Sequence, residues 1–168
     1  MHHELVADRC RMTIEARSSL HPIRVETTEL AGHLDVERTD RGIAIASGAR
    51  LEVELGGLRS GNPLVDTETR RRIDLRRHPR LTATLLSATP AGDGTLACVG
   101  EVTFQDRTER VEGRLEVRDA DEGLEISGTQ VVDVRRWGLR PPRLLVLKVE
   151  PEVRIRLDLR ARPADAPG

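Results

Sequence analysis

The sequence predicts a mainly all-β protein of about eight antiparallel strands, with one short helical segment inserted after the central strands. Two observations support this fold class. Apolar and charged residues alternate with a period of two along most of the chain, and short turn sequences rich in Gly, Asp and Pro separate the alternating segments. Between residues 58 and 84 this alternation stops and a helical pattern takes its place.

The chain before residue 56 contains three strand-like segments. In each of them apolar side chains occupy alternate positions, and charged residues such as Glu52 and Glu54 face water between them. A further segment, residues 18–25, is less regular because Pro22 interrupts it. We therefore expect strands at residues 10–16, 30–36 and 43–55.

Residues 63–75 predict one or two short helical turns. Gly61 and Asn62 form a turn, and Pro63 suits the first position of a helix because its φ angle is already fixed. Acidic residues come first and arginines second, which is the order that the helix dipole favours. Pro79 keeps His78 out of the α conformation and so returns the chain to a strand.

The second half of the chain alternates more clearly. Val111, Leu115 and Val117 share one face with Gly113, while the residues between them are charged. We expect strands at residues 81–89, 96–104, 111–117, 124–134 and 153–159, with a short buried apolar run at residues 144–149 between the last two. Such a chain can close into an up-and-down barrel or pack as a two-sheet sandwich, and the periodicity does not choose between them.

Three segments, in the same order along the chain, resemble the YceI-like family. The first is Ser18-Ser19-Leu20 followed by Leu30, Ala31, Gly32 and Leu34, and the third is residues 134–142, with Trp137 in the aromatic position. The second consists of Leu58, Ser60, Gly61, Asn62, Asp66, Arg72, Asp74, His78, Pro79 and Leu81. The resemblance implies an eight-stranded lipocalin-like β-barrel with the helical segment as a lid. It also implies a long-chain ligand, either isoprenoid or fatty-acid-like.

Length and composition limit the alternatives. A chain of 168 residues fits one domain, which we place at residues 1–162, and residues 163–168 are expected to form a flexible tail. The formal net charge is -1, and Phe104 and Trp137 are the only aromatic residues among Phe, Trp and Tyr. Nucleic-acid binding is therefore not expected, because it needs a basic surface or several stacking rings.

The apolar segments are short. No run approaches the roughly 18 apolar residues of a membrane span, and the first ten residues contain no apolar core of a signal peptide. We therefore expect a cytoplasmic protein. Cys10 and Cys98 are then expected to be reduced and to act as small buried hydrophobic residues.

The expected inner faces of the strands are aliphatic. Gly32, Gly100, Gly113 and Gly128 fall on these faces, where they either leave room for a ligand or merely permit the barrel to curve. We favour an elongated aliphatic cavity, since burial of an acyl or isoprenoid chain requires no polar partner. The expected apolar lining is Val53, Leu55, Leu85, Phe104, Leu115, Ile126, Trp137, Ile155 and Leu157.

The polar end of a ligand is expected near the lid, at Asn62, Arg72 or His78. The alternative for each residue is a structural role as a helix cap, turn residue or ion-pair partner. The arginines between residues 70 and 80 have two interpretations. They form an exposed face neutralised by nearby acids, or they make transient contact with an anionic membrane. A packed barrel that acts as a protein-interaction module, including a homodimer, is the second functional class.

Catalysis, metal binding and cofactors are not expected. Ser60, Asp66, Asp74 and His78 provide the residue types of a catalytic triad, but no G-x-S-x-G turn surrounds Ser60. The five histidines show neither H-x-H nor H-x-x-x-H spacing.

Overall fold

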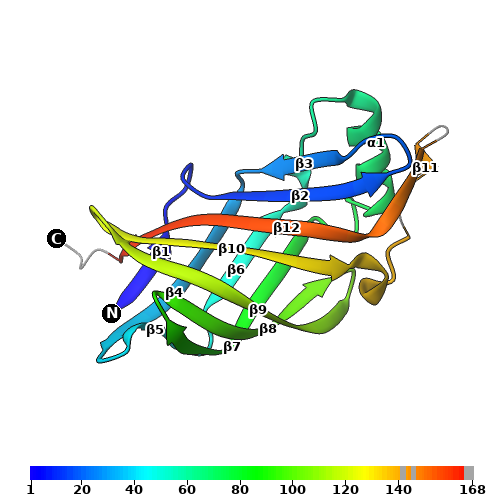
Figure 1. The fold of residues 1–168 in the computed structure, drawn as a ribbon. Coiled ribbons are helices and arrows are strands. Elements are labelled where there is room, and N and C mark those ends of the chain that lie inside the picture. Colours follow the sequence, from blue (N-terminus) through cyan, green and yellow to red (C-terminus); the bar gives the residue numbers. More distant parts are fainter. Residues whose placement is uncertain (141–142, 145–146, 165–168) are drawn as a thin grey trace.

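Eight strand positions close into an antiparallel β-barrel with one short helix at one end (Figure 1). The computed structural model describes residues 1–140, 143–144 and 147–164. Its elements are β1 (His2–Leu5), β2 (Arg11–Ser18), β3 (Ile23–Thr27), β4 (Leu30–Thr39), β5 (Gly42–Ile45), β6 (Arg50–Glu54), η1 (Leu55–Gly57), α1 (Pro63–Arg72), β7 (Arg80–Gly92), β8 (Thr95–Phe104), β9 (Arg107–Ala120), β10 (Gly123–Asp133), η2 (Val134–Trp137), β11 (Arg143–Leu144) and β12 (Leu147–Pro163).

The order of pairing closes the sheet on itself. The strands follow the path β1-β4-β6-β7-β8-β9-β10-β12, and β12 pairs with β1 to complete the ring. Strand β12 also pairs with β2, which in turn pairs with β3. Two of the eight positions around the barrel are therefore each occupied by two strands in succession. Strands β1 and β2 share one position, and β4 and β3 share the other. The predicted barrel is confirmed, and the sandwich is excluded.

Strand β1 was not predicted from the sequence. It contains only four residues and includes two histidines, so it carries no hydrophobic alternation. Its backbone nevertheless joins β4 to β12, with His3 opposite both Leu34 and Pro163. The side chain of His3 is buried, and its Nδ1 lies 3.1 Å from the carbonyl oxygen of Met1.

Several strand boundaries differ from the prediction. Residues 19–22 form a turn before β3, and residues 46–49 separate β5 from β6. Strand β12 runs through Pro151 as one element because an irregularity in its pairing with β2, between Val149 and Val153, accommodates the proline. Much of the buried apolar run expected at residues 144–149 lies outside the residues whose side chains are described.

Helix α1 begins where the sequence predicts it. Pro63 occupies the first helical turn, and the side-chain oxygen of Asn62 accepts hydrogen bonds from the backbone N–H groups of Leu64 and Val65, at 3.0 and 3.5 Å. Figure 1 places α1 at one end of the barrel, near β3 and β11. In the described part of the chain no helix has both the length and the apolar character of a membrane span.

The substitution Asn62→Ala removes this cap. We expect it to lower the free energy of unfolding by about 1 kcal/mol, because two backbone N–H groups lose their acceptor. Urea denaturation followed by circular dichroism measures the change. Asn62→Asp keeps an acceptor at the helix N-terminus and serves as the control, and an equal loss in both variants would contradict the capping role.

Candidate ligand-binding cavity

The lumen of the barrel contains a cavity of about 230 Å³. Most of its lining side chains are aliphatic and occupy the inward positions of their strands, as the alternation of the sequence predicts. These inward residues are Leu5, Leu34, Ile45, Ala49, Leu51, Ala83, Leu85, Cys98, Gly100, Val102, Val111, Gly113, Leu115, Ile126, Gly128, Gln130, Ile155, Leu157 and Leu159.

Two hydrophobic clusters flank the cavity. The helix-end cluster contains Phe104 and Trp137, whereas the opposite cluster contains Leu96 and Leu124. Leu96 and Phe104 lie near opposite ends of β8, so the clusters occupy opposite ends of the barrel. The cavity lies between them, since its lining includes residues that pack against each cluster.

Three of the four predicted inner glycines line the cavity. These are Gly100, Gly113 and Gly128. Gly32 is not among the lining residues. A Cβ atom at this position would lie 2.2 Å from the carbonyl oxygen of Arg50 on the neighbouring strand. Gly32 therefore permits close approach of two backbones.

The nine apolar residues predicted to line the site divide into two groups. Leu85, Leu115, Ile126, Ile155 and Leu157 line the cavity. Val53, Leu55, Phe104 and Trp137 are instead buried within the helix-end cluster. Apart from Trp137, which follows the last residue of its strand, the alternation places these side chains inside the barrel, but it does not give their height along the barrel axis.

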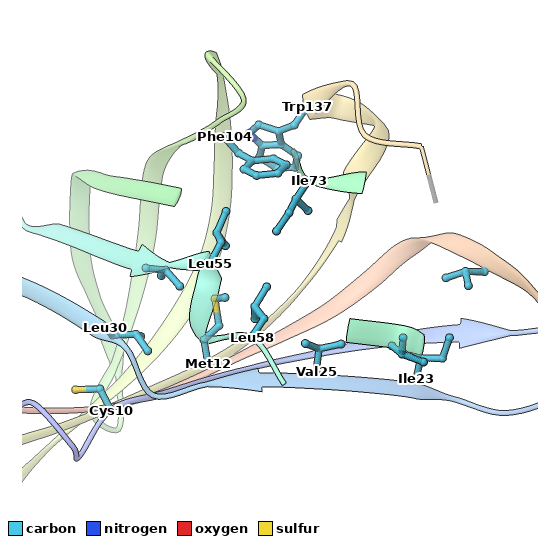
Figure 2. Packing of buried hydrophobic residues seen from close by; sticks show 13 residues of the cluster. Cys10, Met12, Ile23, Val25, Leu30, Leu55, Leu58, Ile73, Phe104 and Trp137 are labelled. Carbon is cyan, nitrogen blue, oxygen red and sulfur yellow. The ribbon is translucent and has the colours of Figure 1, made fainter. Parts of the chain in front are cut away.

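The helix-end cluster is held by one directed polar contact. The indole N–H of Trp137 donates to the carbonyl oxygen of Val102, at 2.9 Å. Figure 2 shows Trp137 beside Phe104, with Ile73 on their inner side. The guanidinium carbon of Arg136 lies 5.4 Å from the centre of the Trp137 ring. Trp137 thus joins the segment after β10 to the wall formed by β8.

The three predicted polar residues lie near helix α1 and not in the cavity lining. Asn62 caps the helix, and Nε of Arg72 lies 3.1 Å from the carboxylate of Glu68. Nδ1 of His78 lies 3.9 Å from the carboxylate of Asp106. These contacts give each residue a structural partner.

The hydroxyl of Ser60 also has a structural partner. It donates to the carboxylate of Asp66, at 2.7 Å, and the same oxygen of Asp66 accepts from the backbone N–H of Ser60, at 2.8 Å. A catalytic serine instead needs a base that removes its proton, in turn oriented by a third group. These two hydrogen bonds stabilise the turn before α1.

Cys98 and Gln130 line the cavity although neither was predicted as a site residue. Both lie on the predicted inner faces, so the alternation of the sequence is sufficient to identify them as candidate lining residues. Cys10, by contrast, lies in the helix-end cluster, and both thiols are free. Burial raises the pKa of the Cys98 thiol above its ordinary value, which keeps the thiol protonated at neutral pH.

Alkylation of Cys98 is expected to be slow at neutral pH. Only the thiolate reacts readily, so the rate should rise as the pH passes the raised pKa of this thiol. A hydrophobic compound in the cavity should slow the reaction further. Labelling with N-ethylmaleimide, followed by peptide mass spectrometry, measures the rate. Cys10 is the internal control, and equal protection of both thiols would contradict a ligand beside Cys98.

Comparisons with known proteins agree with this architecture. BcnA from Burkholderia cenocepacia superposes with a TM-score of 0.78 at 14% identity, covering 94% of this chain and 98% of BcnA. A polyisoprenoid binding domain from Saccharophagus degradans, implicated in plant cell wall breakdown, gives 0.80 at 11% identity, with coverages of 96% and 98%. The Campylobacter jejuni YCEI protein gives 0.69 at 8% identity, and 86% of each chain is covered.

These identities are low, so the structural likeness shows the fold alone. No curated protein sequence matches the chain. The model of the YceI-like domain, however, matches residues 5–161, which is nearly the whole chain. On this evidence the protein belongs to the YceI-like domain family.

Proposed function

We propose that this protein binds the hydrocarbon chain of a long-chain amphiphile, fatty-acid-like or polyisoprenoid, inside the barrel. The observation that carries the proposal is the cavity of about 230 Å³, lined by aliphatic side chains and three glycines. Each buried methylene contributes about 0.8 kcal/mol, so a segment of eight contributes roughly 6 kcal/mol before entropic costs. The name of the Saccharophagus degradans domain also supports a lipid ligand.

The volume of the cavity limits how much of the ligand it can hold. An apolar cavity of about 150 Å³ holds benzene, whereas typical sites for larger ligands occupy about 300–1,000 Å³. The present volume of about 230 Å³ therefore fits a short segment of chain. A long polyisoprenoid would require side chains of a flanking cluster to move or part of the ligand to remain outside.

Contact with an anionic membrane is proposed as the route of ligand exchange. Leu64 of α1 and Leu20 are 68% and 73% exposed. The turn between β2 and β3, which carries Leu20, lies at the helix end of the barrel with α1 (Figure 1). The arginines at the end of α1 would add attraction to anionic lipids, although Arg71 and Arg72 also contact Glu68.

Replacement of Arg70, Arg71 and Arg72 by Ala tests this route. We expect weaker binding to vesicles of phosphatidylserine and phosphatidylcholine, by up to about 1 kcal/mol for each arginine removed. Vesicle co-sedimentation measures the loss, and pure phosphatidylcholine vesicles are the control. Unchanged binding would show that these arginines of α1 do not contribute to membrane contact.

Solvent extraction of the freshly purified protein, followed by mass spectrometry, tests the proposed function. We expect a co-purifying lipid at a stoichiometric level. Uptake of a fluorescent hydrophobic dye, and its displacement by octanol or fatty acids, provides a second measurement. Absence of both lipid and dye uptake would favour the alternative, a packed barrel that associates with other proteins or with itself.

A further inference from the structure

The ladder between β9 and β10 is shorter than its neighbours. Their ladder runs from Gly123 opposite Ala120 to Ser127 opposite Glu116, which makes five pairs, and it does not continue. The ladders on either side each contain ten pairs, between β8 and β9 and between β10 and β12. Strands β9 and β10 diverge toward the end that carries α1 (Figure 1). We call residues 111–113 and 130–133, beyond this ladder, the β9–β10 gap.

The segment after β10 bounds this gap at the helix end. The guanidinium of Arg136 donates to the carbonyl oxygen of Arg110 and lies 3.6 Å from the carboxylate of Glu109. A side chain thus donates to a backbone acceptor of β9 beyond the end of its ladder with β10. The inner edges of the gap carry Val111, Gly113 and Gln130, all of which line the cavity.

Gln130 lies across the inner side of the gap. Its Oε1 atom is 2.8 Å from the place that a Cβ atom of Gly113 would occupy. The amide therefore extends from β10 over β9, into space that the glycine leaves open. It makes no hydrogen bond with any residue in the described part of the chain, and no fully buried side-chain N or O atom there lacks a partner. The amide therefore remains accessible, and Gln130 is a half-buried residue among those that line the cavity.

Gln130 differs from the other polar residues around the cavity. His33, Arg50, Thr84, Arg114 and Thr129 also border it, but each alternates with inward residues and so directs its side chain outward. The guanidinium of Arg50, for example, lies 3.1 Å from the carboxylate of Glu52 on the outer face. Among the residues that line the cavity, Gln130 is therefore the polar side chain that reaches the lumen, apart from the weakly hydrogen-bonding thiol of Cys98.

An amide that lacks a hydrogen-bond partner in the protein, in an apolar cavity, is best complemented by an uncharged hydrogen-bonding group of the ligand. A charged group there would lose its hydration without an opposite charge on the inner face. We propose that Gln130 binds an uncharged oxygen of the ligand, a hydroxyl or carbonyl, which lies at the β9–β10 gap. This inference rests on the proposed function and specifies the chemical class of ligand, namely an alcohol, ester or ketone with a hydrocarbon chain.

Four probes of equal chain length test the inference: octane, 1-octanol, methyl octanoate and octanoate. Their affinities are measured by displacement of an apolar fluorescent dye from the wild type and from Gln130→Leu. We expect octanol and methyl octanoate to bind the variant about 2- to 13-fold more weakly, which corresponds to one lost neutral hydrogen bond. Octane should bind both proteins equally, and octanoate should be the weakest of the oxygen-containing probes.

Three outcomes would overturn the inference. These are unchanged affinity for octanol and the ester, an equal loss for octane, and tighter binding of octanoate than of octanol. If no probe binds the wild type, the proposed function itself fails. Val131→Ala, at an exposed position on the same strand, controls for disturbance of β10. If Gln130→Leu does not fold, Gln130→Met provides a second apolar replacement of similar length.

Discussion

Ala83→Phe is expected to abolish most ligand uptake. Ala83 lines the cavity from β7, between Leu51 on β6 and Val102 on β8. A benzene-sized group fills a cavity of about 150 Å³, so the added ring would occupy most of the 230 Å³ available. Loss of contact with four methylenes corresponds to roughly 3 kcal/mol, or about a 100-fold decrease in affinity.

The control for this variant is Thr82→Phe. Thr82 belongs to the same strand but occupies an outward position, opposite Glu52 and Thr103. Dye displacement by octanol measures the affinity of both variants, and thermal denaturation shows whether they remain folded. Wild-type affinity in a folded Ala83→Phe protein would place the ligand elsewhere and contradict the proposed site.

The alternation of residues predicted which side chains face the lumen. Leu115 and Gly113, for example, face inward because their strand pairs in the register that the pattern requires. Period-two alternation reports only the face of a side chain. Whether an inward residue borders the cavity or packs into an end cluster depends on the stagger of neighbouring strands. The alternation therefore does not distinguish Leu115, which lines the cavity, from Phe104, which packs in the helix-end cluster.

Two other features arise from backbone pairing and leave no hydrophobic pattern. Strand β1 closes the ring although its four residues are mostly polar. The β9–β10 gap lies within two strands that alternate as clearly as any in the chain. Gln130 could be placed on an inner face from its position in β10, but its lack of a protein partner depends on the divergence of β9.

Trp137→Ala is expected to lower the free energy of unfolding by about 3–5 kcal/mol. The side chain is buried in the helix-end cluster, so its removal loses apolar contact and leaves a void. The carbonyl oxygen of Val102 also loses its donor. Trp137→Phe, which keeps most of the ring contact, should cost less than half as much. Urea denaturation compares the two variants, and equal losses would show that the hydrogen bond matters more than the packing.

The same variant decides what Trp137 does for ligand binding. Val102 both lines the cavity and accepts the indole hydrogen bond, so the space vacated by the ring would adjoin the cavity. If Trp137 closes the helix end, Trp137→Ala should bind longer alcohols, such as dodecanol, more tightly relative to octanol. If Trp137 instead contacts the ligand, affinity should fall for both alcohols. The ratio of the two affinities separates these roles even in a less stable protein.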